Sequence, residues 1–387
     1  MLGTHMCKNN KYHNKSLINS TVILTFLSLL GLIPQYLIRS NLAISMWFYQ
    51  KFTTYPGDLW YCWNNYLNVG RPYPREYPSL IQILFRIINL IPGVNDNYTY
   101  YLIFPVFILS ICAVICSCIL YKLHPQLKPI LWLWLFAPSY LFYGLFNLDF
   151  LPIVMMIASY YYFKQNKYVP SAIYLAIGTA IKVFPIFLFP IYFFSCTENK
   201  EKIRLLVVCI CTWAIINIPF MLIDWNSWAF PYMWQIQSNF AKTASDGSWT
   251  WLIFKSFAYF GHGEWSGKIS LLIFILLYGY LIKKYWHLSL ARKLLIVIIL
   301  FLLTDRVYSP QYNLYLLPFL ILVDYKINWK YFYMLELPNF VQVFFVFTLK
   351  QQPIIQQGII FVKYIALIML LLQAIGASTI NKKVEVN

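Results

Sequence analysis

The sequence has little charge for its length. Only 11% of its 387 residues are charged, while 60% are hydrophobic. An ordinary soluble domain has about 25% charged residues, so the composition excludes a soluble globular protein. Apolar runs such as 269–282 and 354–372 recur along the chain. Each approaches the roughly 20 residues of a membrane-spanning helix, which excludes a single-span or peripheral membrane protein.

Several motifs that mark other classes of protein are absent. The sequence has no CxxC pair followed by histidines, which excludes a structural zinc site, and no DxD motif that would hold a metal-bound nucleotide sugar. We therefore expect neither a metal ion nor a cofactor. The net charge of +17 does not indicate a nucleic-acid partner, because the basic residues punctuate apolar runs and form no soluble basic stripe.

The apolar runs predict an all-α integral membrane protein. No internal repeat or Gly/Ser linker divides the chain, so residues 1–387 form a single polytopic domain in the cell membrane. Lys8, Lys11 and Lys15 lead straight into the first apolar run, which we expect to be retained as an anchor. We predict about twelve transmembrane helices, which start near residues 17, 98, 128, 149, 168, 184, 205, 267, 293, 309, 331 and 353.

The basic residues predict the topology. If the amino terminus is cytoplasmic, the cytoplasmic turns and termini hold 18 of the 30 Lys and Arg residues, as the positive-inside rule requires. The two long polar loops, residues 40–97 and 224–266, then lie outside and hold six of the thirteen acids. Within the first loop an apolar stripe at helical spacing predicts a helix that lies in the membrane interface. The stripe consists of Leu80, Leu84, Ile87, Ile88 and Ile91.

The first outer loop carries a candidate catalytic carboxylate, Asp58. It follows a Pro-Gly turn and precedes the amphipathic residues Trp60, Tyr61 and Trp63, so we place it at the level of the headgroups. A partly desolvated carboxylate there is suited to act as a base. Residue type alone favours a structural role, in which Asp58 caps a helix that begins at Leu59.

Asp58 opens a series of short motifs. "GRPY" at 70–73 and "EYPSL" at 76–80 follow it in the same loop. Further along the chain are "FNLDF" at 146–150, the spacing of Gly178, Lys182 and Pro185, and "SPQY" at 309–312.

In this order, the motifs resemble those of the glycosyltransferase C superfamily. Within it they are most similar to family 87, the polyprenol-phosphate-mannose-dependent mannosyltransferases. The sequence departs from that pattern at Ser79, where a second Pro is usual. It departs again at Asn147 and Asp149, where Gly, Gln and Asn are usual.

The resemblance implies a GT-C fold and an inverting transfer of a hexose, with mannose favoured. The donor is a polyprenyl-phosphate sugar, and the acceptor is a glycolipid or envelope glycan on the non-cytoplasmic face. By position, Asp58 takes the role of the base that deprotonates the acceptor hydroxyl. Cations are then required around the donor phosphate, and the candidates are Lys182, Arg306, Arg71 and Arg75.

Each of these cations also has a structural interpretation. Lys182 suits either phosphate binding or snorkelling to the headgroups. Arg306 suits phosphate oxygens or a salt bridge with a neighbouring acid. Arg71 and Arg75 suit the donor phosphate or an anionic acceptor headgroup, unless Glu76 neutralises Arg75.

A further set of polar and aromatic residues is expected to contact the sugar or the acceptor. Tryptophans beside amides in the second loop suit a sugar or polyprenyl site, and they also suit an interfacial belt. "SPQY" is equally an ordinary helix start with Pro at its first position. The set consists of Tyr73, Glu76, Tyr77, Asn147, Asp149, Asn239, Lys242, Trp249, Gln311 and Tyr312.

Two other classes of function stay open. A flippase or secondary transporter of lipid-linked sugars would also have many spans. Such a protein would carry charges near mid-membrane and internal repeats, whereas the acids here concentrate in the outer loops. A non-catalytic assembly subunit would not depend on Asp58.

Overall fold

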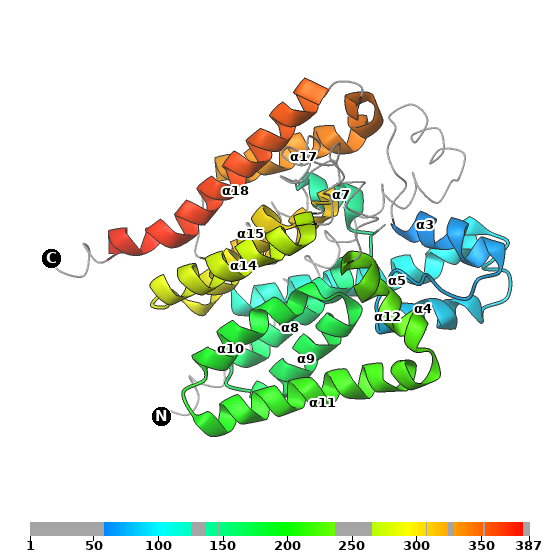
Figure 1. Cartoon of the computed structure of the whole chain (residues 1–387), viewed down its shortest axis with the longest axis horizontal. Helices are drawn as coiled ribbons and strands as arrows, with labels where there is room; N and C mark the ends of the chain where they lie inside the picture. The colour runs from blue at the N-terminus through cyan, green and yellow to red at the C-terminus, as the bar shows by residue number, and fades with distance from the viewer. Residues whose placement is uncertain are drawn as a thin grey trace, which may run out of the picture.

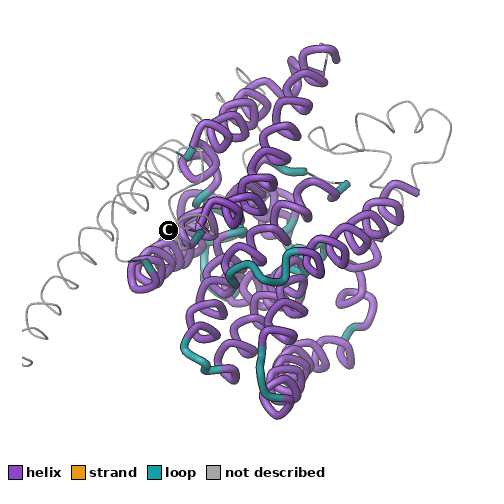
Figure 2. Tube along the Cα trace, turned by 90° about the vertical axis from the view of Figure 1, so that its left-hand side faces the viewer, coloured by secondary structure: helices purple, strands orange, loops and turns teal. Residues whose placement is uncertain are grey.

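The structure is a computed structural model that describes most of the chain as helices joined by short loops (Figures 1 and 2). The predicted spans near 17 and 128, together with Asn239, Lys242 and Trp249, lie outside the described residues. Those residues contain no β-strand, which confirms the predicted all-α class. They are 58–124, 137–145, 147–236, 265–306, 308–323, 329–350 and 353–381.

α8 is a deeply buried helix of the first half of the chain. Its apolar residues are buried on all sides, as expected for a helix without a polar face, and it packs against both α5 and α9. The elements are α3 (Asp58–Asn65), η1 (Leu67–Val69), α4 (Ser79–Asn89), α5 (Tyr98–Leu123), α7 (Pro138–Tyr143), α8 (Phe150–Lys164), α9 (Tyr168–Ile181), η2 (Phe184–Leu188), α10 (Phe189–Ser195), α11 (Asn199–Ile223) and α12 (Trp225–Ile236).

The second half of the chain is organised around α15. Its residues from Leu294 to Leu300 are completely buried, because α14, α16 and α18 all pack against it. The elements are α14 (Trp265–Lys284), α15 (Leu290–Thr304), η4 (Pro310–Tyr315), α16 (Leu316–Leu322), α17 (Trp329–Lys350) and α18 (Pro353–Asn381).

Each predicted span on described residues coincides with one of these helices or with a 3₁₀ segment that leads into one. Three helical stretches of the described chain are long and apolar enough to cross a membrane: Tyr98–Leu123, Asn199–Ile223 and Gln357–Gly376. Several shorter apolar helices accompany them. A multi-pass membrane protein is therefore confirmed, while the number of twelve spans stays a prediction.

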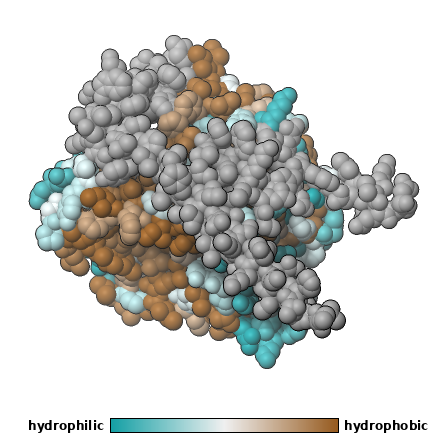
Figure 3. All heavy atoms as spheres, turned by 180° about the vertical axis from the view of Figure 1, so that it is seen from behind, coloured by the Kyte–Doolittle hydropathy of each residue, from teal (hydrophilic) through white to brown (hydrophobic). Residues whose placement is uncertain are grey.

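The surface of the bundle is apolar where a membrane would surround it. On α5, Ile103, Phe107, Ile111 and Ile115 are exposed at a spacing of four residues, which places them on one helix face. Figure 3 shows a broad hydrophobic area across one side of the molecule, with hydrophilic residues towards its edges.

The helix predicted in this part of the first loop is present as α4, while its place in the membrane interface stays a prediction. Ile81, Phe85 and Ile88 are buried, and the helix packs against α9 and α11. Ile87 and Leu90 are 56% and 80% exposed. Of the predicted apolar stripe only Ile88 is fully buried in the protein, so most of that stripe is left partly or fully exposed.

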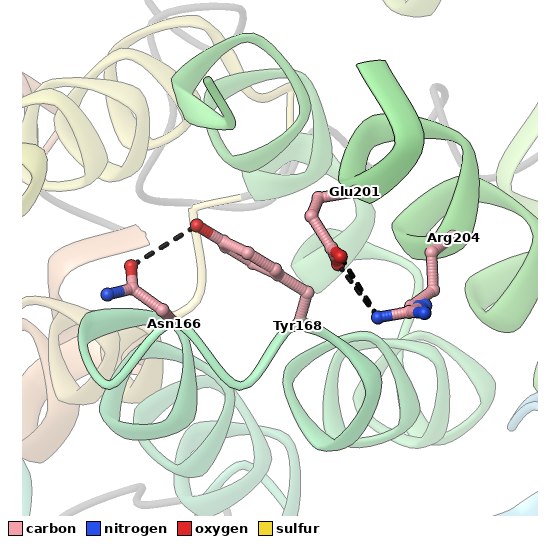
Figure 4. Close-up of polar contacts among 4 residues, drawn as sticks. All are labelled: Asn166, Tyr168, Glu201 and Arg204. Carbon is pink, nitrogen blue, oxygen red and sulfur yellow. Dashed lines mark hydrogen bonds and ion pairs between the residues drawn. The ribbon is translucent and has the colours of Figure 1, made fainter. Parts of the chain in front are cut away.

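The two ends of the bundle differ in character. Figure 1 shows α3, α4 and α12 gathered at one end, with the turns before α11 and between α14 and α15 at the other. The second end is rich in Lys and Arg. There Tyr168 donates to Asn166 at 3.2 Å, and Arg204 pairs with Glu201 at 2.9 Å (Figure 4).

A buried carboxylate on α17 joins three elements. Glu336, which is fully buried, accepts hydrogen bonds from the Asn313 side chain on η4 and from the Ser139 backbone N–H on α7, both at 2.7 Å. One helical turn further, the Asn339 amide donates to the carbonyl of Pro310 at 2.8 Å. We call Glu336, Asn313, Ser139 and Asn339 the Glu336 network.

Replacing Glu336 with Ala should destabilise the protein. The change leaves the Asn313 amide and the Ser139 N–H buried without their acceptor, and each such group costs about 1–3 kcal/mol. We expect a lower midpoint of thermal unfolding for the purified protein in detergent. Leu337→Ala, at a neighbouring position that is 55% exposed, is the control. Equal midpoints for the two variants would contradict the role given to the network.

Candidate active site

Three interrupted helical segments meet close to the start of α3. α8 begins directly after Asp149, α9 ends directly before Lys182, and η4 leads into α16. Irregular backbone occurs inside membrane proteins only where it is buried in protein or lines a cavity. These interruptions therefore mark the place where polar groups gather.

The spacing of Gly178, Lys182 and Pro185 has a local structural reason. A Cβ at Gly178 would lie 3.1 Å from Cβ of Met155 on α8 and 3.4 Å from Pro185, so glycine permits this close packing. α9 then stops because Lys182 takes an extended conformation (φ −153°, ψ 135°) and Pro185 follows at the start of η2. Lys182 thus lies at the interruption.

The Lys182 ammonium is held by one carboxylate and two aromatic rings. It forms an ion pair with Oδ1 of Asp149, which also accepts from the Tyr315 hydroxyl. Asp149 is fully buried, and its Oδ2 has no hydrogen-bond partner among the described residues. The ammonium lies 4.7 Å from the ring centre of Tyr312 and 5.7 Å from that of Tyr315, within the range of cation–π attraction.

Asp58 is the first residue of α3, and its carboxylate faces this ion pair. The Tyr77 side chain and the backbone of Leu148 are hydrogen-bonded to the carboxylate. Burial first, and the negative charge of Asp149 second, raise the pKa of Asp58 to about 7, although Lys182 and the two hydrogen bonds oppose the shift. A carboxylate with this pKa exchanges its proton near neutral pH.

Arg306 lies in the loop after α15 and is only 8% exposed. A Cβ at Gly267 of α14 would lie 3.5 Å from Cδ of Arg306, so α14 covers its aliphatic part. Asp305 and Tyr312 interact electrostatically with its guanidinium. Tyr312 therefore neighbours both Arg306 and Lys182. Gln311, the preceding residue of η4, is half-buried.

The other predicted residues of the first loop line a separate pocket. Arg71 and Arg75 are exposed, whereas Tyr73 is buried. Glu76 accepts hydrogen bonds from the hydroxyls of Tyr61, at 3.0 Å, and Tyr66. Glu76 and Arg75, both described, form no ion pair. Six residues were predicted in this loop. Asp58 and Tyr77 lie at the Lys182–Asp149 ion pair, and the other four line this pocket.

The predicted residues before α8 are both buried. Asn147 is 2% exposed, and its side-chain oxygen has no partner among the described residues. Asp149 binds Lys182 as given above. Within the described part of the chain, no three His, Cys, Asp or Glu side chains come together as metal ligands would.

Sequence reasoning missed Tyr315 and the Glu336 network. Tyr315 follows Tyr312 by three residues, and residues three apart lie on the same face of a 3₁₀-helix. This spacing could have indicated that Tyr315 lies in the site with Tyr312. Glu336 stands alone in a strongly apolar run, and an ionisable residue in such a run is a functional candidate by default.

The geometry agrees with one comparison. The model of glycosyltransferase family 87 matches residues 76–324, well over half of the chain. This range includes Asp149, Lys182, Arg306 and Tyr312, whereas Asp58 precedes it. Comparisons with curated proteins and with solved structures give no match. The predicted resemblance is confirmed by the family match, and the chain belongs to glycosyltransferase family 87.

Proposed function

We propose that this enzyme transfers a hexose, with mannose favoured, from a polyprenyl phosphate to a glycolipid or envelope glycan, and that Asp58 is the catalytic base. The single observation behind this proposal is that the buried Asp58 carboxylate interacts with both members of the Lys182–Asp149 ion pair, where burial raises its pKa to about 7. A base is most effective when its pKa lies near the working pH.

In the proposed reaction the acceptor hydroxyl attacks the anomeric carbon of the donor. Asp58 takes the proton of that hydroxyl as the new C–O bond forms. The bond between the anomeric carbon and the phosphate oxygen breaks on the opposite face, so the anomeric configuration inverts. The leaving group is polyprenyl phosphate, which gains negative charge as it departs.

We assign the donor phosphate to Lys182, with Arg306 as a second cation. Both are close to Tyr312, so a phosphate near that ring would reach both charges. Cations placed where negative charge develops stabilise the transition state without reorganisation. In this assignment Asp149 and Tyr315 hold Lys182 in position, and Gln311, Tyr312 and Asn147 are left to contact the sugar.

We further infer that the site faces the non-cytoplasmic side. Lys164, Lys167, Lys200, Lys202 and Arg204 lie at the opposite ends of α8, α9 and α11 from Asp58. Basic residues collect on the cytoplasmic side of membrane proteins. A lipid-linked donor is available on the outer side, where nucleotide sugars are not.

Asp58→Asn should nearly abolish transfer. Removal of a general base lowers kcat/KM by about 10²- to 10⁴-fold. The assay is transfer of radiolabelled mannose from polyprenyl-phosphate mannose to a lipid extract by the purified enzyme. Asp96→Asn is the matched control, because Asp96 belongs to the same loop and is exposed. Wild-type activity in Asp58→Asn would refute the assignment. Movement of lipid-linked sugar across liposomes without bond formation would support a transporter.

The pH dependence should report the pKa of Asp58. The base acts when deprotonated, so kcat/KM should fall tenfold per pH unit below about 7 and level off above it. In Asp149→Asn the acid limb should move to lower pH, because the charge of Asp149 raises the pKa of Asp58. The measurement is kcat/KM from pH 5 to pH 9, about two units either side of that pKa. A limb that stays in place or moves upward would contradict the proposed pairing.

Lys182→Gln should weaken donor binding. Loss of one hydrogen bond to a charged group is worth about 1.5–3 kcal/mol, so we expect the donor KM to rise about 10- to 100-fold. Lys182→Arg keeps the charge and should retain part of the affinity. Lys164→Gln removes a lysine from the far end of α8 and is the control. A donor KM unchanged in Lys182→Gln would rule out phosphate binding there.

A further inference from the structure

A pocket of about 460 Å³ is lined by the loop that follows α3 and by α12. Its lining includes Arg71, Arg75 and Glu76, with the ring of Tyr66 from the same loop and that of Phe230 from α12. This volume falls in the range of small-molecule binding sites. The pocket therefore brings together two cations, one carboxylate and aromatic rings.

The loop is shaped so that its two arginines remain available. Gly70 adopts φ +74°, in the left-handed region that favours glycine, and turns the chain so that the N–H of Arg71 reaches the carbonyl of Tyr66 at 2.8 Å. The Arg71 guanidinium then lies 6.0 Å from the Tyr66 ring centre. The guanidinium groups of Arg71 and Arg75 form no hydrogen bond or ion pair with any described residue.

Asp224 is an acid that interacts with the charge of Arg75, but its carboxylate is already hydrogen-bonded elsewhere. The Asp224 carboxylate accepts the backbone N–H of Ser227 at 3.0 Å, at the start of α12. Hydrogen bonds from the Ser227 side chain first and from its backbone N–H second, more than the charge of Arg75, lower the pKa of Asp224. Arg75 consequently keeps its full capacity for an external anion, and a guanidinium fork matches the geometry of phosphate oxygens.

Glu76 has one oxygen free for a ligand. Its Oε1 accepts from Tyr61 and Tyr66, while its Oε2 is buried and has no partner among the described residues. A buried carboxylate oxygen without a donor is costly. A sugar hydroxyl donates hydrogen bonds, and the neighbouring rings suit the apolar face of a sugar.

The pocket lies within reach of Asp58 along α3. Asp58 precedes Tyr61 by three residues and Tyr66 by eight, and a helix rises about 1.5 Å per residue. The backbone of Tyr66, which lines the pocket, is therefore displaced by about 12 Å along the helix direction from that of Asp58. Tyr77 binds Asp58 and is adjacent in sequence to Glu76, so the two sites share one loop.

The position of α4 indicates how a ligand arrives. This helix begins directly after the loop, and Ile87 and Leu90 on its outer side are 56% and 80% exposed. Exposed apolar residues on a helix that is too short to span a membrane are typical of the interface. The pocket therefore lies beside the headgroup layer, and a lipid would approach it with its phosphate at this level.

We propose that this pocket binds the headgroup of the acceptor, and that the acceptor is a phosphate-bearing glycolipid. Arg71 and Arg75 bind its phosphate, Glu76 accepts from a sugar hydroxyl, and the hydroxyl to be glycosylated lies at Asp58. The inference rests on the proposed function. It assigns Arg71 and Arg75 to the acceptor, and it leaves the donor phosphate to Lys182 and Arg306.

The test uses the purified full chain and the lipids of the cells that produce it. The lipids are separated by anion exchange into a neutral and an anionic fraction. Each fraction is incubated with enzyme and radiolabelled polyprenyl-phosphate mannose in a neutral detergent. We expect label in the anionic fraction. In Arg71→Gln/Arg75→Gln the KM for that fraction should rise about tenfold or more, with the donor KM unchanged.

Lys200→Gln/Arg204→Gln is the matched control. It removes two exposed charges at the opposite end of the bundle, where Arg204 pairs with Glu201 on the surface (Figure 4). An exposed pair of this kind contributes about 0–1 kcal/mol. We expect this variant to keep the wild-type KM for both substrates.

Four results would overturn the inference. Label in the neutral fraction alone would show an uncharged acceptor, and the proposed function would stand. An unchanged acceptor KM in Arg71→Gln/Arg75→Gln would show that the two arginines do not bind the acceptor, and the proposed function would again stand. Labelling of the neutral fraction only when phosphatidylglycerol vesicles are added would assign the arginines to bulk membrane phosphate. Absence of label in both fractions would reject the proposed function as well.

Discussion

The contact between Asp149 and Lys182 is the constraint on which the rest of the site depends. It joins the end of α9 to the start of α8, and Tyr315 fixes it to η4. A buried ion pair recovers its desolvation cost only when further hydrogen bonds and good geometry support it. Here a hydroxyl and two aromatic rings provide that support. Three segments that are distant in the sequence are thereby held at one point.

The same contact separates the properties of two neighbouring carboxylates. Asp149 is paired directly with Lys182, whereas Asp58 feels that cation only at longer range and also feels the charge of Asp149. One lysine cannot neutralise both groups, so Asp58 holds its proton more tightly. The two carboxylates therefore have different partners, and we assign them different roles: Asp149 holds Lys182, and Asp58 faces the acceptor.

The helices were predictable from the sequence because membrane spans leave a strong compositional signal. The runs near 98, 168 and 353 begin where α5, α9 and α18 begin. The interruptions were harder to predict, since Pro and Gly mark a break without showing which breaks meet. Asp149 illustrates this limit. Its departure from the family pattern put it in doubt, and only the fold places it against Lys182.

The arrangement of the basic side chains could not be predicted from the sequence, for a different reason. Lys182, Arg306, Arg71 and Arg75 have the same chemistry, so a phosphate site was predicted for all of them. Tertiary packing places Lys182 and Arg306 near the Tyr312 ring, and it places Arg71 and Arg75 in the pocket beside Glu76. Nothing in the spacing of the four residues encodes this division, because α12, which supplies Phe230, comes from a remote part of the chain.

The position of Glu336 has a consequence for how the protein is made. The segment that matches the family ends at residue 324, and it contains every residue assigned to the donor. Yet η4 is held by Glu336 and Asn339, which lie on α17 and emerge from the ribosome later. Chains insert from the amino terminus onward, so η4 reaches the membrane before its support does. The nascent chain therefore contains the residues assigned to the donor before it contains Glu336 and Asn339, which fix η4 through Asn313 and Pro310.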